Sequence, residues 1–179
     1  MIDQVLFMMR SFKMKDLIEL TKLFHVKHGF TVGAKLEDCK NEETNVLLDR
    51  IATMMLQFAK QLESLLKPNV DERIPRVQLM IEELGESIEA MAHRDEVALL
   101  DGLSDLMFVT MGTAIALDLP LEAGVLEVCN SNLTKATRQS NDSRLRDKGS
   151  DYKPPNMAGV IEVYRRIQER TSKCNNQQE

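Results

Sequence analysis

The stretch VQLMIEELGESIEAMAHRDEVALLDGLSDLMFV, residues 77 to 109, predicts two helices joined by a short turn. In its first half apolar residues recur every three or four positions, which is typical of a helix with one buried side. These residues are Val77, Met80, Ile81, Leu84, Ile88 and Met91. Asp95 predicts the N-cap of the second helix, and Glu96 suits the positive end of its dipole. We therefore expect an antiparallel helix hairpin that turns near Arg94.

The rest of the chain has the same helical periodicity, with few glycines and prolines between its segments. Further predicted helices cover about residues 3–28, 36–67, 120–136 and 157–170, with Pro120 at a first helical position. We expect an all-α helix bundle that forms a single domain over residues 1–179. A loop is predicted at about 136–156 and a frayed tail from about 171.

The composition excludes several classes of protein. A net charge of -5 argues against a nucleic-acid surface, and the three cysteines are too far apart for a disulfide framework or a zinc site. The longest apolar stretch, LMFVTMGTAIAL, has about half the length of a membrane span. We expect a cytoplasmic protein without a membrane or nucleic-acid partner, whose core is filled mainly by Met, Leu and Ile.

Four glutamates, Glu82, Glu83, Glu86 and Glu89, lie within residues 81–90 without a Lys or Arg among them. On a helix whose apolar stripe is centred on Leu84, three of them point to the far side and Glu83 lies on a flank. One interpretation is a solvated helix face. However, Glu82 and Glu86 form an i,i+4 pair of like charge, which destabilises a helix slightly.

The second helix of the hairpin favours a metal site. Asp101 and Asp105 lie in a helix that is apolar on nearly all sides, and residues 96–134 contain no Lys, Arg or His. A buried carboxylate without a partner is costly and is resolved by a raised pKa, a distant cation or a metal ion. In the predicted hairpin Glu86 stands level with Asp101, and Glu82 stands level with Asp105. With Glu83 as a fifth member, these oxygen ligands suit Mg²⁺ or Mn²⁺.

The order of four motifs resembles the all-α nucleoside triphosphate pyrophosphatase superfamily, in particular its MazG-like, phosphoribosyl-ATP pyrophosphohydrolase-like branch. The four motifs are EELGE, DGLSDLMFVTMGTAI, SNLTK at residues 131–135 and KGSDYKPP at residues 148–155. The N-terminal segment LFHVKHGF at residues 23–30 also resembles the opening helix of that branch. The common superfamily pattern E-x-x-D is not met, because Gly102 stands three residues before Asp105. The pair of Asp101 and Asp105 takes its place.

The resemblance implies a Mg²⁺-dependent enzyme that hydrolyses a nucleoside triphosphate to the monophosphate and pyrophosphate. The implied metal ligands are Glu82, Glu83, Glu86, Asp101 and Asp105, and Glu83 is our choice of general base. Lys135 and Lys148 are expected to bind phosphate, whereas the alternative for this basic segment is ordinary solvation. Asn132 is expected to bind sugar or phosphate, and Tyr152 to stack on a base or to pack.

Three questions stay open at this point. The resemblance implies a dimer or higher homo-oligomer, but apolar stripes also serve the core of a monomer. The substrate is either a nucleoside triphosphate, such as dUTP or a non-canonical nucleotide, or phosphoribosyl-ATP. The alternative outside the enzymes is a helical interaction protein whose acidic cluster is only structural.

Overall fold

The computed structural model describes residues 13–68, 70–136 and 148–175, and these ranges contain six α-helices, one 3-10 helix and no strand. The prediction of an all-α helix bundle is confirmed. The chain divides into two compact units. We call Ala34–Asp118 the three-helix unit, and we call Met1–Gly33 together with Leu119–Glu179 the split unit. The single domain expected from the sequence stays a prediction.

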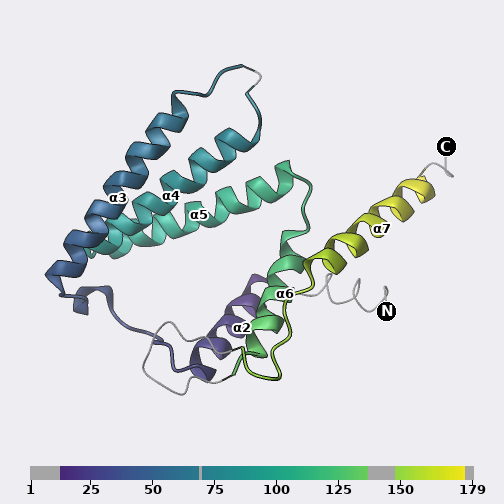
Figure 1. The fold of residues 1–179 in the computed structure, drawn as a ribbon, viewed down its shortest axis with the longest axis horizontal. Coiled ribbons are helices and arrows are strands. Elements are labelled where there is room, and N and C mark those ends of the chain that lie inside the picture. The colour runs from purple at the N-terminus through teal and green to yellow at the C-terminus, as the bar shows by residue number, and fades with distance from the viewer. Residues whose placement is uncertain (1–12, 69, 137–147, 176–179) are drawn as a thin grey trace. The chain divides into compact units, whose positions relative to one another are not determined.

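The three-helix unit consists of α3 (Glu42–Glu63), α4 (Arg73–His93) and α5 (Glu96–Ala116), and α4 packs against both α3 and α5 (Figure 1). The side chain of Asp95 accepts hydrogen bonds from the backbone N–H groups of Val97 and Ala98, at 3.0 Å each, so the predicted N-cap of α5 is confirmed. A similar cap begins α3 later than the predicted residue 36, because Asn41 accepts from the N–H of Thr44 at 2.9 Å.

The hairpin turns at Arg94, as predicted. This residue has a φ of 60°, and the N–H of Asp95 donates to the carbonyl of Ala90 at 3.0 Å, which ends α4. Two contacts tie this end of α4 to α3. His93 Nε2 lies 3.4 Å from Asp49 Oδ1, and Arg94 Nη1 forms an ion pair with Glu42 Oε1 at 3.6 Å.

Small residues make the closest contacts inside the three-helix unit. A Cβ on Gly102 of α5 would lie 2.8 Å from Ser87 Oγ of α4, and a Cβ on Gly85 would lie 3.0 Å from Leu56 Cδ2 of α3. The buried apolar residues of the described chain are alanines and one valine. The expectation that Met, Leu and Ile fill the core is therefore wrong for the fully buried positions, and Leu84 does not mark the buried side of α4 because 39% of it is exposed.

Helix α5 exposes a broad apolar surface. Val97, Leu100, Phe108 and Ile115 are each at least 70% exposed. Among the described residues, α5 is also the one helix whose length and apolar composition would allow it to cross a membrane, and core helices of soluble proteins can have the same length and composition. Helix α5 begins ten residues before the apolar stretch LMFVTMGTAIAL, and this added part contains Asp101 and Asp105.

The split unit consists of α2 (Met14–Lys27), α6 (Leu121–Leu133) and α7 (Met157–Asn175), with α6 in contact with both other helices. Pro120 is the N-cap of α6 and not its first helical residue. Asn156 caps α7, since its Oδ1 accepts from the N–H of Gly159 at 3.0 Å. Residues 3–12 of the predicted first helix and residues 137–147 of the predicted loop lie outside the described residues.

Candidate active site

The contact between α4 and α5 sets the register of the acidic residues. Ser87, which is 1% exposed, lies against Gly102, and each of these residues follows a predicted metal ligand, Glu86 on α4 and Asp101 on α5. Because the helices are antiparallel, a register with Ser87 opposite Gly102 differs by two residues, about 3 Å, from the predicted level pairing of Glu86 with Asp101, which stays a prediction. Because the helices are antiparallel, Glu82 and Asp105 lie one turn further from the hairpin turn.

The five predicted carboxylates lie within electrostatic range of one another. The pKa of Glu83 is raised, first by burial and then by the charges of Glu86, Asp105, Glu82 and Asp101. Burial also raises the pKa of Glu86, which is raised further by Glu82, Asp105, Glu89 and Asp101. We call these five carboxylates the acidic cluster; its members are Glu82, Glu83, Glu86, Asp101 and Asp105. No ion pair between a member of the acidic cluster and a Lys, Arg or His is found within the described residues.

The burial expected for the two aspartates is wrong. Asp101 and Asp105 are exposed, whereas Glu82 and Glu83 are half-buried. The reason is that α5 buries only the narrow side around Gly102, Val109 and Ala114. The residues of the cluster whose pKa is raised are therefore glutamates of α4, namely Glu83 and Glu86.

The chemistry of the acidic cluster fits a hard divalent cation, because all of its donors are carboxylate oxygens. Burial is the first cause of the raised pKa of Glu83 and Glu86, and the repulsion that adds to it is what such a cation would relieve. However, in the described part of the chain no three His, Cys, Asp or Glu side chains are gathered closely enough to hold a metal ion. The metal site stays a prediction.

Two polar residues near the cluster were missed in the sequence. Gln78 is 5% exposed and donates from Nε2 to Glu82 Oε2 at 2.8 Å, which orients one predicted ligand. The spacing of four residues between them is the sequence signal, because i,i+4 residues are neighbours on a helix. Arg76 lies on α4 with its Nη1 at 3.5 Å from the position that a Cβ of Gly112 would take.

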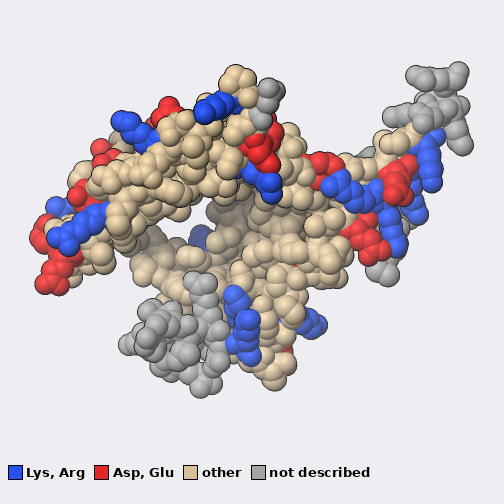
Figure 2. All heavy atoms as spheres, turned by 45° about the horizontal axis from the view of Figure 1, so that its top comes forward, with Lys and Arg blue, Asp and Glu red and all other residues tan. Residues whose placement is uncertain are grey.

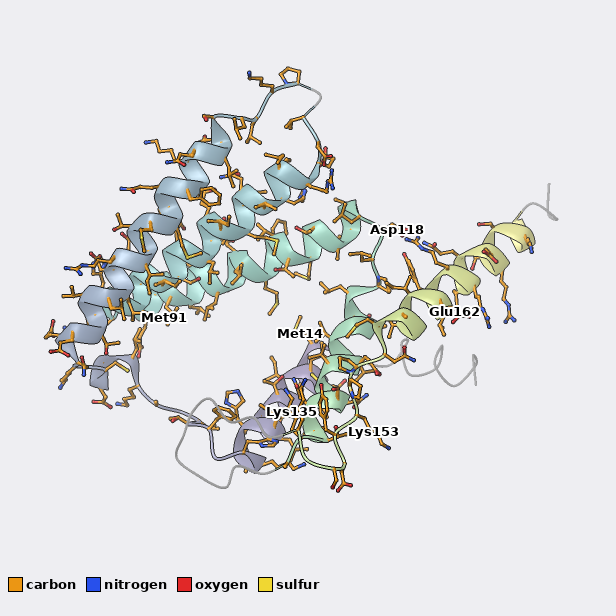
Figure 3. The ribbon with its side chains drawn as sticks, viewed as in Figure 1. Met14, Met91, Asp118, Lys135, Lys153 and Glu162 are labelled. Carbon is orange, nitrogen blue, oxygen red and sulfur yellow. The ribbon has the colours of Figure 1, made fainter. Side chains whose placement is uncertain are left out.

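The predicted substrate residues all belong to the split unit. Asn132 lies near the end of α6, Lys135 follows this helix, and Lys148 and Tyr152 precede α7. Figure 3 labels Lys135 and Lys153 in this region. Lys148 Nζ lies 5.2 Å from the centre of the Tyr152 ring, so these two predicted binding residues contact each other.

Hydrogen bonds join SNLTK to KGSDYKPP. Ser131 Oγ donates to the carbonyl of Lys153 at 2.7 Å, and the N–H of Lys153 donates to Thr134 Oγ1 at 2.8 Å. Lys27 of α2 donates to the carbonyl of Leu133, which brings in LFHVKHGF. Three of the segments that carry the resemblance are thus parts of one local structure.

His28, the C-cap residue of α2, supports this local structure. It is 6% exposed, and its ring lies 4.4 Å from the ring of Phe24 between centroids. Burial lowers the pKa of His28, as do the charges of Lys27 and Lys135, while a hydrogen bond with the backbone of Ala136 raises it. His28 is therefore a buried core residue, one of the two ordinary roles expected for the histidines.

The comparisons with known proteins bear on most of the three-helix unit and on α6 of the split unit. Residues 53–132 match the family model described as phosphoribosyl-ATP pyrophosphohydrolase. The search of curated proteins and the search of solved structures gave no match. The matched range includes Asn132 and the whole acidic cluster, but it ends before Lys135, Lys148 and Tyr152.

This family implies a pyrophosphohydrolase, a hydrolase that acts on phosphoric anhydrides, and it generally depends on a divalent metal. The match confirms the resemblance carried by EELGE and DGLSD. Over residues 53–132 the chain is thus similar to the phosphoribosyl-ATP pyrophosphohydrolase family, which belongs to the MazG-like all-α nucleoside triphosphate pyrophosphatase superfamily.

Proposed function

We propose that the protein is a Mg²⁺-dependent pyrophosphohydrolase that cleaves a nucleoside or deoxynucleoside triphosphate to its monophosphate and pyrophosphate. The observation that carries this proposal is the acidic cluster, in which burial and, after it, mutual repulsion raise the pKa of Glu83 and Glu86. Carboxylates placed at such an electrostatic cost are typical of functional sites. The family match over these residues supports the same chemistry.

The residues of the acidic cluster would hold Mg²⁺, with Mn²⁺ as a substitute, and the metal would neutralise phosphate charge when bound. Gln78 holds Oε2 of Glu82, so that its other oxygen is free to act as a ligand. Glu83 is the proposed general base. Its raised pKa brings it closer to neutral pH, where a carboxylate accepts a proton from water more readily.

The proposed reaction is a hydrolysis of one anhydride bond. The water oxygen forms a bond to the α-phosphorus, and the bond from this phosphorus to the bridging oxygen breaks. Pyrophosphate leaves with the electron pair, and Glu83 takes the proton of the water. In the split unit, Lys135 and Lys148 are proposed to bind phosphate, Asn132 to bind sugar or phosphate, and Tyr152 to contact the base.

Phosphoribosyl-ATP is a second candidate substrate, and it fits the family match at least as well. Its hydrolysis breaks the same α–β anhydride bond, so the acidic cluster serves both candidates equally. The two differ only outside the triphosphate. A non-canonical nucleotide or dUTP would make the enzyme a house-cleaning one.

The test is a substrate panel with purified protein and Mg²⁺. It contains the standard ribo- and deoxynucleoside triphosphates, dUTP, non-canonical triphosphates and phosphoribosyl-ATP. We expect monophosphate and pyrophosphate as products of at least one member, with no diphosphate or free phosphate. Faster turnover of phosphoribosyl-ATP than of every simple triphosphate would make it the substrate.

Two variants separate the enzyme from a helical interaction protein with a structural acidic cluster. Glu86→Gln removes a proposed ligand and should lower kcat by about 100-fold or more. Glu43→Gln on the exposed first turn of α3 is the matched control and should leave kcat unchanged. Absence of turnover in the whole panel, together with a melting temperature that Mg²⁺ does not raise, would support the interaction protein.

We also propose that the protein is soluble and cytoplasmic and forms a homo-oligomer, a dimer or a tetramer. The exposed apolar surface of α5 supports this assembly, because large exposed apolar patches mark interaction sites. On the face drawn in Figure 2, uncharged side chains cover broad areas between the charged ones.

A further inference from the structure

Arg76 is a cation on the same helix as three members of the acidic cluster. Its Nη1 lies 3.5 Å from the position that a Cβ of Gly112 would take, so its guanidinium lies against α5. Only 28% of its side chain is exposed. Arg76 therefore occupies the seam between α4 and α5, although it belongs to the first turn of α4.

The pairing of this guanidinium within the described residues is poor. Its nearest acidic partner is Glu72, with Nη2 and Oε2 3.8 Å apart, and the side chain of Glu72 is 70% exposed. Its Nε is buried and has no hydrogen-bond partner among the described residues. A partly buried guanidinium with so little compensation is unfavourable in the free protein.

Helix geometry places this cation in line with the acidic cluster. Arg76 lies seven residues before Glu83 on α4, and Gly112 lies seven residues after Asp105 on α5. Seven residues are close to two turns, so Arg76 and Glu83 share a side of α4, just as Gly112 and Asp105 share a side of α5. The guanidinium thus lies about 10 Å along the seam from Glu83 and Asp105, away from the hairpin turn.

This position is complementary to a polyphosphate. Carboxylates can bind phosphate oxygens only through a metal, whereas a guanidinium binds them directly, often through two parallel hydrogen bonds. A phosphate chain whose reacting end lies at the acidic cluster can extend along the seam toward Arg76. A phosphate there would also provide the compensation that the guanidinium lacks.

We propose that Arg76 binds the pyrophosphate portion of the substrate, an inference that rests on the proposed function. Arg76 would hold the β- and γ-phosphates before cleavage and the pyrophosphate product after it. This role is distinct from that of Lys135 and Lys148, which belong to the split unit.

The test compares three variants in the Mg²⁺-loaded enzyme, with the best substrate of the panel. Arg76→Gln should raise both KM and the inhibition constant of pyrophosphate by roughly 10- to 100-fold, because a charged hydrogen-bond donor to phosphate is lost. Arg76→Lys keeps the charge without the paired donors, and its constants should lie between those of Arg76→Gln and the wild type. Arg73→Gln is the matched control, since Arg73 lies in the same turn but is exposed and paired with Asp71 at 2.7 Å.

A folded Arg76→Gln protein with the KM and pyrophosphate inhibition of Arg73→Gln would overturn the inference. If Arg76→Gln does not fold, the test rests on Arg76→Lys. A KM and a pyrophosphate inhibition constant of Arg76→Lys equal to those of the wild type would then overturn the inference. If the wild type turns over no substrate, the proposed function fails, and calorimetric titration with Mg²⁺ and pyrophosphate decides about Arg76 separately. Weaker binding by the variant then supports the inference, and equal binding overturns it.

Discussion

Glu83 and Glu86 are the two members of the acidic cluster whose pKa is raised in the folded protein. Burial is the largest cause of the raised pKa at both residues, and the neighbouring carboxylates add to it. A carboxyl group whose pKa is raised by folding binds protons more tightly in the folded state. Its contribution to stability is therefore fully present below its ordinary value of 4.5 and is lost as pH rises through the raised pKa.

This loss of stability with rising pH leads to a prediction for the metal-free protein. In EDTA at pH 7 to 8, Glu83→Gln should have a melting temperature roughly 1–3 °C above that of the wild type, because it removes a repelled charge. The difference should vanish near pH 4, where the wild-type carboxyl is protonated. Thermal denaturation followed by circular dichroism across this pH range measures it.

Added Mg²⁺ should reverse the order of the two proteins, since only the wild type has the complete set of proposed ligands. Glu43→Gln serves again as the control and should follow the wild type in both conditions. A melting temperature of metal-free Glu83→Gln below that of the wild type at pH 8 would contradict this account of Glu83.

At the scale of the element, the important feature of α5 is how little of it is buried. Its contact with α4 is narrow and depends on Gly102, which leaves space for Ser87. The close approach of the two backbones keeps Asp101 and Asp105 within electrostatic range of Glu83. Gly112 lies in the same helix, but a Cβ there would meet Arg76 only at an ordinary contact distance of 3.5 Å.

The two glycines should therefore respond oppositely to alanine. Gly102→Ala places a methyl group 2.8 Å from Ser87 Oγ and 3.2 Å from Ser87 N, and it should lower the free energy of unfolding by about 1–3 kcal/mol. Gly112→Ala adds helix propensity without a clash and should raise that free energy by up to about 1 kcal/mol. Urea denaturation measures both changes. Equal stability of the two variants would show that the helices separate easily at Gly102.

At the scale of the whole molecule, charge is divided between the two units. The acidic cluster and Arg76 belong to the three-helix unit, while the proposed phosphate-binding lysines belong to the split unit. The large apolar side chains of α5 are exposed in the single chain, so they are available for contact with another molecule. Such a surface favours association in water.

The proposed oligomer can be tested by sedimentation velocity. The wild type should sediment with at least twice the monomer mass of 20.4 kDa. Phe108→Asp places a charge on the exposed surface of α5 and should shift the protein toward the monomer, because burying an unpaired charge is costly. Phe58→Asp on α3, where the native side chain is 49% exposed, is the matched control. A wild type of monomer mass would remove α5 as an oligomer interface.

The sequence by itself determined the helices and the position of the hairpin turn at Arg94. Helical periodicity and the cap at Asp95 act over a few residues, so their effects can be predicted locally. The spacing about Arg94 then predicted Glu86 level with Asp101, and the contact of Ser87 with Gly102 gives a register about 3 Å away from this pairing. The family resemblance could likewise be recognised from motif order.

Only the tertiary structure decided how these residues are buried and which of them interact. Burial falls on Glu83 and not on the exposed Asp101, because small residues allow α5 to contact α4 along a narrow side. The same packing places Arg76 against Gly112, a neighbour that no local pattern identifies. Desolvation and Coulomb interactions depend on the surroundings contributed by other helices, so they become known only when the helices are packed.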